Sequence, residues 1–388
     1  MKNIVIVGAG LSGSSMARLL AEECGCHVII LEKRTHIAGN IYDEYMNGIL
    51  VQKYGPHFIA TFSWEVVEFL MKYTGFYEYP IRAKSFVNGK FIDRPYNFRT
   101  LQQLLGPENS APVLERIRKA FPNMHRVTLG EIVNNTDDVV SNYGKLLYNT
   151  LFVPYCAKQW GMKVEDISPD VINRTDIVLG YETQLDDTDF QYLPEKGYTE
   201  MIKRMLDYPN IKVYLNVDAR EHLLFDDVNH KVLYNGSEDE IIYYTGELDL
   251  LFHNCYGELP YRSRYFSYST YEESPVLPCG VITYPKEREY LRQTEFKQFN
   301  PSGEWKGSIV QSEYSLPMNR AAQKGNEPYY PVLNDKNMDQ HNKYKQLAAK
   351  YSNLYYGGRL ADFRYYDIDT AVLKVFDDFK KIKARIGK

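Results

Sequence analysis

Cysteines are scarce in this sequence, and they form no CxxC pair. The 388 residues include five cysteines and eight histidines. An odd, sparse set of cysteines in a long chain is not a disulfide framework and indicates a reducing compartment, so we expect a cytoplasmic protein. The histidines show no spacing typical of metal ligands, and we expect no bound metal. The cysteines are Cys24, Cys26, Cys156, Cys255 and Cys279.

Long apolar runs and an excess of basic charge are also missing. No stretch of about 18 uninterrupted apolar residues occurs, so we expect no membrane insertion. The run MKNIVIVGAG is broken by glycines and is typical of a buried strand, not of a signal peptide. Lysine and arginine number 46 against 50 aspartate and glutamate, which gives a net charge of −4. This balance argues against nucleic acid as a partner, and an anionic ligand would need locally placed arginines.

Tyrosine, by contrast, is abundant. The chain has 34 tyrosines beside 18 phenylalanines and 3 tryptophans, so aromatic residues make up 14% of it. An aromatic ring can stack on a nucleobase, and a phenol can donate a hydrogen bond to phosphate without adding charge. We expect most of these tyrosines to be structural and a few to line a ligand site.

The first forty residues carry the strongest local motif. An apolar run, Ile4–Val7, is followed by Gly8-Ala-Gly10-Leu-Ser-Gly13 and by apolar residues at helical spacing. A second apolar run ends in Glu32, 19 residues after Gly13. Such glycines permit a tight turn, close approach of a pyrophosphate and close packing of helix and strand, while the carboxylate accepts ribose hydroxyls. The segment predicts a dinucleotide-binding βαβ unit, and an acidic Glu32 argues against an NADP 2′-phosphate.

The rest of the chain alternates between helix-like and strand-like sequence patterns. Residues 108–161 have helical periodicity and predict an inserted helical subdomain. Residues 240–320, beginning with EIIYYTGELD, read as short strands with turn signals and predict an antiparallel sheet. The last stretch reads as a strand, a glycine turn and a long terminal helix. We expect the terminal elements to complete the nucleotide-binding domain.

Several residues could bind an anionic or aromatic ligand, although each has a plainer interpretation. Tyr155 and Trp160 could be core aromatics at a helix end or a platform for a nucleobase. Arg174 could be solvated surface or a mobile phosphate clamp. Arg262 and Arg292 lie in strand-like sequence, where an arginine is either on the wet face or in bidentate contact with a pyrophosphate. The sequence shows no Ser/His/Asp triad, P-loop or carboxylate pair with an acid/base role.

A dozen motifs in order and register resemble the bacterial UDP-galactopyranose mutase family over nearly the whole chain. They include VIVGAGLSG, KYGPHF, RPYNF, YCAKQWG, INRTDI, QYLPEKGYT, YYTGELD, PYRSRYF, YLRQTEFKQF, EPYYPV and GGRLADFRYYDID. The resemblance implies an α/β fold: a Rossmann-like FAD-binding domain with an inserted helical bundle and an antiparallel β-sheet domain. The expected ranges are 1–80, 195–240 and 345–388 for the FAD domain, 101–165 for the helices, and 81–100, 166–194 and 241–344 for the sheet domain.

The resemblance also implies an activity. The family interconverts pyranose and furanose forms of a nucleotide sugar without net redox change, here UDP-galactopyranose to UDP-galactofuranose by default. Reduced flavin N5 attacks the anomeric carbon and the adduct opens to an iminium, so an external reductant is implied. The same reaction on a UDP-N-acetylhexosamine or a dTDP-deoxysugar stays open, as do an FAD oxidoreductase and an inactive nucleotide-sugar binder. Furanose supply for cell-surface polysaccharide and a homodimer are further expectations from the family.

Residue roles are carried over from the resemblance as expectations. Catalysis is expected of Arg174, Arg292 and His57. Substrate binding is expected of Phe152, Tyr155, Trp160, Arg174, Arg262, Arg292, Tyr329, Tyr330 and Tyr365. FAD binding is expected of Gly8, Gly10, Ser12, Gly13, Glu32, Lys33, Asn40, His57, Phe58, Val217, Arg359, Tyr366 and Asp367.

Three positions depart from the family pattern. Ala60 stands where the GPHIFHT-type motif has its second histidine, and we expect it to influence sugar specificity. Leu185 replaces a tyrosine that usually contacts the diphosphate, and Val178 replaces the second arginine of an RxPxR run. These changes are compatible with the fold and the flavin site but leave the identity of the sugar open.

Overall fold

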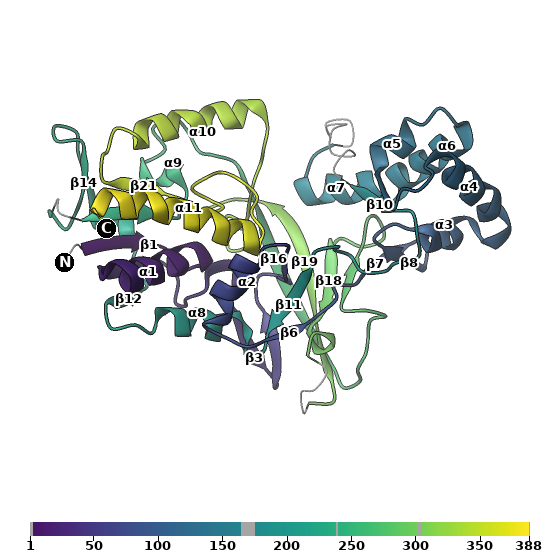
Figure 1. Cartoon of the computed structure of the whole chain (residues 1–388), viewed down its shortest axis with the longest axis horizontal. Helices are drawn as coiled ribbons and strands as arrows, with labels where there is room; N and C mark the ends of the chain where they lie inside the picture. The colour runs from purple at the N-terminus through teal and green to yellow at the C-terminus, as the bar shows by residue number, and fades with distance from the viewer. Residues whose placement is uncertain (1–2, 164–174, 238–239, 301–304, 388) are drawn as a thin grey trace.

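A parallel sheet forms the end of the molecule at which both termini lie (Figure 1). The structure is a computed structural model, and it describes residues 3–163, 175–237, 240–300 and 305–387. In this part of the chain the sheet has five strands in the order β12-β2-β1-β15-β21. They are β1 (Asn3–Val7), β2 (His27–Glu32), β12 (Ile211–Leu215), β15 (Ile241–Tyr244) and β21 (Leu354–Tyr356). The apolar run of β1 explains its central place, because Ile4, Val5 and Ile6 are fully buried.

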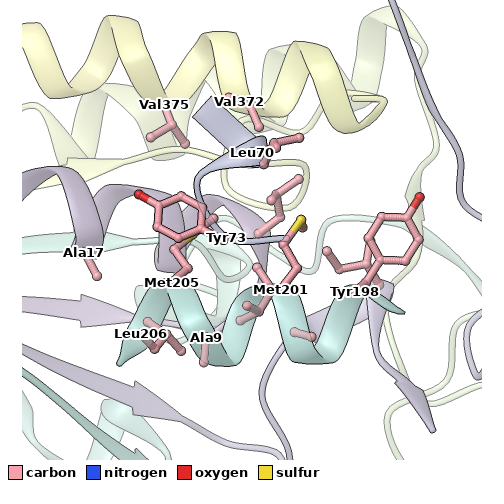
Figure 2. Packing of buried hydrophobic residues seen from close by; sticks show 14 of the residues in the cluster. Ala9, Ala17, Leu70, Tyr73, Tyr198, Met201, Met205, Leu206, Val372 and Val375 are labelled. Atoms are coloured by element: carbon pink, nitrogen blue, oxygen red, sulfur yellow. The ribbon is translucent and has the colours of Figure 1, made fainter. Parts of the chain in front are cut away.

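Helices pack on one face of the parallel sheet. They are α1 (Leu11–Cys24), α8 (Gly197–Leu206) and α11 (Ile368–Ile386), with α2 (Trp64–Met71) beside them. Figure 2 shows Met201 of α8 directed toward Leu70, with Met205 further along α8 and Val372 of α11 beyond Leu70. All four side chains are fully buried. This apolar layer fixes α1 behind the glycine loop that follows β1.

A second apolar layer covers the other face of the parallel sheet. It is formed by the hairpin β13 (Leu223–Asp226) and β14 (Lys231–Tyr234), the short α9 (Leu248–Leu251) and α10 (Asp335–Ala348). Val5 and Ile242 of the sheet contact this layer, which contains the fully buried Tyr344 of α10. The parallel sheet is therefore covered on both faces, as parallel sheets are in general.

The strand at 241–244 corrects one prediction. The sequence placed EIIYYTGELD in the antiparallel sheet, but β15 pairs in parallel with β1 and with β21. The physical reason is that all four of its residues are buried, so both faces of the strand must be covered by helices. The prediction for 240–249 was wrong, and α10, within the range 241–344, also packs on the parallel sheet.

A second sheet lies in the middle of the molecule (Figure 1). Within the described residues its order is β20-β16-β19-β18-β17-β7-β8. All pairings are antiparallel except that of β17 with β7. The strands are β7 (Ala83–Val87), β8 (Lys90–Arg94), β16 (Tyr261–Tyr271), β17 (Val281–Thr283), β18 (Arg292–Glu295), β19 (Ser308–Pro317) and β20 (Tyr330–Pro331).

A helical body occupies the end of the molecule far from the parallel sheet (Figure 1). Asn97 and Thr128 begin helices with capping boxes, and Asp137 caps a third helix. Residues 148–152 form one π-helical turn between the last two helices. The elements are α3 (Phe98–Leu105), α4 (Pro107–Ala120), β9 (Arg126–Thr128), α5 (Leu129–Val133), α6 (Asp138–Leu147), α7 (Val153–Trp160) and β10 (Asp176–Val178).

Small elements connect these three bodies. They are β3 (Asp43–Met46), β4 (Ile49–Gln52), β5 (Ile59–Thr61), β6 (Phe76–Glu78), β11 (Phe190–Pro194) and the 3-10 turns at 39–41, 219–221 and 296–298. The architecture confirms the predicted α/β class, with a Rossmann-like parallel sheet and a mixed, largely antiparallel second sheet. Among the described residues, no helix is both long enough and apolar enough to cross a membrane.

Candidate cofactor groove and substrate cluster

A groove runs over the carboxyl ends of the parallel strands, with about 1260 Å³ of empty space that includes the open solvent at its mouth. Its walls come from the loop after β1, the end of β2, residues 217–220, residues 244–247 and the segment 358–371. The groove is thus built by chain segments that the parallel sheet brings together. Twelve of the residues expected to bind FAD line it: Gly8, Gly10, Ser12, Gly13, Glu32, Lys33, Asn40, His57, Val217, Arg359, Tyr366 and Asp367.

Gly8 and Gly13, in the loop between β1 and α1, leave no room for side chains. Gly8 has φ +100°, a conformation that L side chains rarely adopt. A Cβ on Gly13 would lie 2.0 Å from the carbonyl oxygen of Gly8. Without side chains here, α1 packs closely behind the loop, a geometry that suits the predicted pyrophosphate site at the N-terminus of α1.

Glu32 is fixed at the end of β2 by two backbone N–H groups. Its Oε2 accepts a hydrogen bond from the N–H of Ala9, and its Oε1 accepts one from the N–H of Arg34, both at 2.8 Å. The carboxylate is 5% exposed. Each oxygen retains a lone pair for a ribose hydroxyl, so this geometry suits the predicted role.

His57 and Arg359 lie together at the other end of the groove. Burial, together with the positive charge of Arg359, lowers the pKa of His57 to about 3, so the ring is neutral near pH 7. Its Nδ1 donates to the carbonyl of Gly55 at 2.9 Å, which leaves Nε2 as the acceptor nitrogen, 3.3 Å from the Tyr329 hydroxyl. Nη2 of Arg359 donates to the carbonyl of Tyr366 at 2.6 Å, while its buried Nη1 has no hydrogen-bond partner.

Next to this end, two arginines share one buried carboxylate. Glu313 of β19 lies 2.8 Å from Nε of Arg264 on β16 and accepts a hydrogen bond from Nε of Arg292 on β18, also at 2.8 Å. The side chains of Arg264 and Glu313 are 2% and 3% exposed. Nη1 of Arg264 is buried without a hydrogen-bond partner. The pairing holds both guanidinium groups rigidly and leaves excess positive charge.

Aromatic rings surround these arginines. The ring centroids of Tyr329 and Tyr330 are 4.6 Å apart, and Tyr330 lies 5.3 Å from Tyr365. The guanidinium of Arg359 lies 5.1 Å from the ring centroids of both Tyr330 and Tyr365, and that of Arg264 lies 4.9 Å from Tyr330. The arginine–tyrosine cluster, defined as Arg264, Arg292, Glu313, Arg359, Tyr329, Tyr330 and Tyr365, is cationic and rich in phenol groups.

The helical body contributes its last helix to this cluster. The ring of Trp160 on α7 lies 6.2 Å from that of Tyr330. Tyr155 lies near Arg94, at 5.7 Å from ring centroid to guanidinium, and its hydroxyl pKa is raised by burial. Phe152 is 9% exposed and packs in the core of the helical body.

Arg262 is part of the same charged region. Its Nη2 donates to Oγ of Ser315 at 3.0 Å, and its guanidinium fills the space in which a Cβ on Gly161 would lie. Burial and the like charge of Arg264 lower the pKa of Arg262 to about 10. An anion bound between these arginines would relieve that repulsion.

Some predicted residues lie elsewhere. Phe58 does not line the groove, and its ring packs 5.2 Å from that of Phe299. Ala60 lies in β5 opposite Gln191, and Leu185 packs against the core beneath the parallel sheet. Val178 is buried in β10, and Arg174 lies outside the described residues.

Sequence reasoning missed Arg264 and Glu313, which organise the cluster. A signal for the first was present, because Arg262 and Arg264 are two residues apart in a strand and so share one face. Glu313 gave no comparable signal, since its partners Arg264 and Arg292 come from two other strands. Tertiary pairing alone brings these three residues together.

A Rossmann-like sheet with a glycine-lined groove, opening onto a second sheet, defines the dinucleotide-dependent enzymes with the flavin amine oxidase type of fold. Two solved structures share this fold. A reduced UDP-galactopyranose mutase superposes with TM-score 0.68 at 15% identity, covering 99% of this chain and 94% of that one. A putrescine oxidase bound to putrescine superposes with TM-score 0.57 at 13% identity, covering 99% of both chains.

Sequence comparison is more specific. The family model for UDP-galactopyranose mutase matches residues 150–365, and that for an NAD(P)-binding Rossmann-like domain matches residues 6–73. A dTDP-fucopyranose mutase of Escherichia coli is 32% identical over 97% of both chains. A UDP-galactopyranose mutase of Mycoplasma genitalium is 31% identical over 96% of this chain and 92% of that one. The chain belongs to the UDP-galactopyranose mutase family, so the predicted resemblance is confirmed.

Family membership makes the chain a nucleotide-sugar pyranose/furanose mutase, an isomerase, and implies FAD as its cofactor. The residues present fit that cofactor. The glycine loop lines the groove at the N-terminus of α1, Glu32 is fixed for a ribose, and the unpartnered Nη1 of Arg359 can donate to a polar group of the flavin.

Proposed function

We propose that the chain interconverts UDP-galactopyranose and UDP-galactofuranose, with reduced FAD in the groove and the sugar diphosphate on the arginine–tyrosine cluster. The observation that supports this most is that Arg359 belongs to both sites: it lines the groove and lies over Tyr330 and Tyr365. When bound and reduced by an external reductant, the flavin supplies the nucleophile for the anomeric carbon. The protein supplies position and charge.

The cluster is suited to hold a diphosphate during the reaction. Guanidinium groups form short, strong hydrogen bonds to phosphate oxygens, and the two phenol hydroxyls of Tyr330 and Tyr365 can donate without adding charge. Glu313 holds Arg264 and Arg292 in place before the ligand arrives, so little side-chain entropy is lost on binding. A diphosphate kept in place after bond cleavage is positioned to attack the rearranged sugar again.

The end of α7 is suited to receive the base. Tyr155 and Trp160 lie on this helix, which Lys158 attaches to the sheet. Nζ of Lys158 donates to the carbonyls of Tyr284 and Arg288, and Oγ of Ser315 donates to the carbonyl of Gln159 at 2.6 Å. We propose that these contacts fix the distance between the aromatic platform and the diphosphate arginines. Arg174, predicted to close over the diphosphate, stays a prediction.

His57 is suited to accept a hydrogen bond at the flavin end of the groove. Its proton resides on Nδ1, and burial beside Arg359 keeps Nε2 unprotonated near pH 7. The Tyr329 hydroxyl donates to the carbonyl of Tyr54, so its single proton is engaged there. The lone pair on Nε2 is therefore available to a ligand in the groove.

A dTDP-6-deoxysugar is the second candidate substrate. The relative from Escherichia coli, described as a dTDP-fucopyranose mutase, is as similar to this chain as the UDP-galactopyranose mutases are. Ala60, in place of the second histidine of the family motif, removes a hydrogen-bond donor, and a 6-deoxysugar has one hydroxyl fewer to satisfy. We propose that Ala60 and Leu185 influence this choice.

A substrate panel tests the proposal. Dithionite-reduced protein is incubated anaerobically with UDP-galactose, UDP-N-acetylgalactosamine and dTDP-fucose, and the furanose products are resolved by anion-exchange chromatography. The highest kcat/KM is expected with UDP-galactose; a higher value with dTDP-fucose would select the second candidate. Ala60→His serves as the matched variant and should shift the ratio toward UDP-galactose. If no nucleotide sugar gives a furanose, the proposal is wrong.

A further inference from the structure

A carboxylate outside the expected FAD-binding set lies in the wall of the groove. Glu247 follows Thr245 and Gly246, and all three line the groove beyond the end of β15. The side chain of Glu247 is 4% exposed. Lys33, which lines the same groove, is its neighbour on one side, and Arg320 is its neighbour on the other.

The side-chain carboxylate of Glu247 is held by the charges of its neighbours and not by hydrogen bonds. Its Oε1 lies 3.8 Å from Nη2 of Arg320 and has no hydrogen-bond partner. Its Oε2 lies 3.9 Å from Nζ of Lys33. Both distances exceed those of hydrogen bonds. Arg320 instead donates to Oδ2 of Asp249 at 3.0 Å, so the close partner of Arg320 is Asp249.

A buried carboxylate without a hydrogen bond is unfavourable unless a ligand supplies one. The position of Lys33 indicates that the ligand comes from the groove. Oε2 is on the side of Lys33, and Lys33 is itself a groove residue. Glu32, the other carboxylate at this end, already accepts a backbone N–H on each oxygen. Of the two carboxylates, Glu247 therefore has more hydrogen-bond acceptor capacity left for a ligand than Glu32.

We propose that Glu247 binds the adenosine half of FAD by accepting a hydrogen bond from a ribose hydroxyl or from the adenine amino group. The neighbouring wall fits a purine, since the apolar side chains of Leu31, Val217 and Ala219 line the groove beside it. Lys33 and Arg320 place positive charge beside the carboxylate, and hydrogen bonds to carboxylates are stronger than those between neutral groups. The inference rests on FAD occupying the groove and does not depend on which sugar is used.

Titration of apo-protein with FAD and with FMN tests this role. FMN lacks adenosine, so Glu247→Ala should raise the dissociation constant for FAD about tenfold and leave that for FMN unchanged, as flavin fluorescence reports. Glu258→Ala is the matched control. Glu258 also pairs with Arg320, at 3.2 Å, but is 68% exposed and does not line the groove. This control should bind both flavins as the parent does.

Competition with ADP and with IDP separates the two donors. Weaker binding of both nucleotides to Glu247→Ala identifies the ribose, and weaker binding of ADP alone identifies the adenine amino group. If Glu247→Ala does not fold, Glu247→Asp retains the charge but withdraws the oxygens, and the same loss for FAD is expected. FAD affinity equal to that of the parent, or equal losses for FAD and FMN, would overturn the proposal.

Discussion

The groove and the arginine–tyrosine cluster are neighbouring parts of one site, but they are built in different ways. The groove owes its shape to backbone: glycines at the start of α1, backbone N–H groups around Glu32 and the carboxyl ends of parallel strands. The cluster owes its shape to side chains, with Glu313 between Arg264 and Arg292 and with Tyr330 between two guanidinium groups.

The difference has consequences for evolution and for mutation. A cofactor common to many reactions is held by features that any βαβ unit can supply, whereas a particular substrate needs a particular set of side chains. Substitutions in the groove should therefore change cofactor affinity through local sterics. Substitutions in the cluster should change stability and substrate affinity through unpaired charge.

Removal of the shared carboxylate should have the largest effect. Glu313→Ala leaves the buried Arg264 and the partly exposed Arg292 without their partner, and breaking a buried pair in this way costs about 3–5 kcal/mol. Urea unfolding should report that loss. Asp377→Ala, which removes an exposed partner of Lys380, is the control and should unfold as the parent does. Equal stability of both variants would show that the cluster is not held by Glu313.

A side chain introduced into the glycine loop should have the second-largest effect. In Gly13→Ala the new Cβ would lie 2.0 Å from the carbonyl oxygen of Gly8, so the loop must shift. Such overpacking costs about 1–3 kcal/mol, and we expect FAD to bind roughly tenfold to a hundredfold more weakly. Calorimetry with UDP should show an unchanged affinity in the same variant. A parallel loss of UDP binding would mean that groove and cluster are not separable.

The pH dependence of the free energy of unfolding should show the contribution of His57. Its pKa is about 3 in the folded protein because of burial and the charge of Arg359, against about 6.5 in the unfolded chain. The neutral ring therefore stabilises the fold above pH 6.5, and this contribution is lost as pH falls toward 3. Between pH 7 and pH 5 the loss is about 1–2 kcal/mol, and His57→Gln should flatten the profile by that amount. The exposed His27→Gln should leave it unchanged.

A single phenol in the cluster should have the smallest effect. Tyr365 is 48% exposed, and its hydroxyl donates to Oδ1 of Asp367 at 2.8 Å, so it must exchange this partner in order to donate to the diphosphate. Tyr365→Phe removes one donor to the diphosphate, so we expect UDP to bind about fivefold more weakly, or about 1 kcal/mol. FAD affinity should not change, and neither should the UDP affinity of Tyr271→Phe at the far end of β16. An unchanged UDP affinity in Tyr365→Phe would remove this residue from the substrate site.

Sequence could predict the groove because its determinants are local. Gly8, Gly10, Gly13 and Glu32 lie within 25 residues, and their spacing alone specifies the turn, the helix start and the ribose carboxylate. The cluster was only partly predictable. Arg292, Tyr330 and Tyr365 came from a family resemblance, and the pairing of Arg264 with Glu313 depends on strand neighbours that are distant in sequence.

The wrong assignment of β15 has a similar origin. EIIYYTGELD has the β-type residues of a strand, and that part of the prediction is confirmed. Which sheet a strand joins depends on what covers its two faces, and for β15 those covers are α11 on one side and α9 with α10 on the other. These helices lie up to about 140 residues further along the chain, beyond the reach of local periodicity.

We expect the groove and the arginine–tyrosine cluster to act as one site for a reaction without net redox change. Anaerobic incubation of the reduced holoprotein with UDP-galactose, with product chromatography and flavin absorbance followed together, tests it most directly. We expect UDP-galactofuranose to form while the flavin stays reduced, and we expect that the oxidised protein neither forms product nor is reduced by the sugar. Reduction of the oxidised flavin by the nucleotide sugar, or no furanose from the reduced protein, would contradict it.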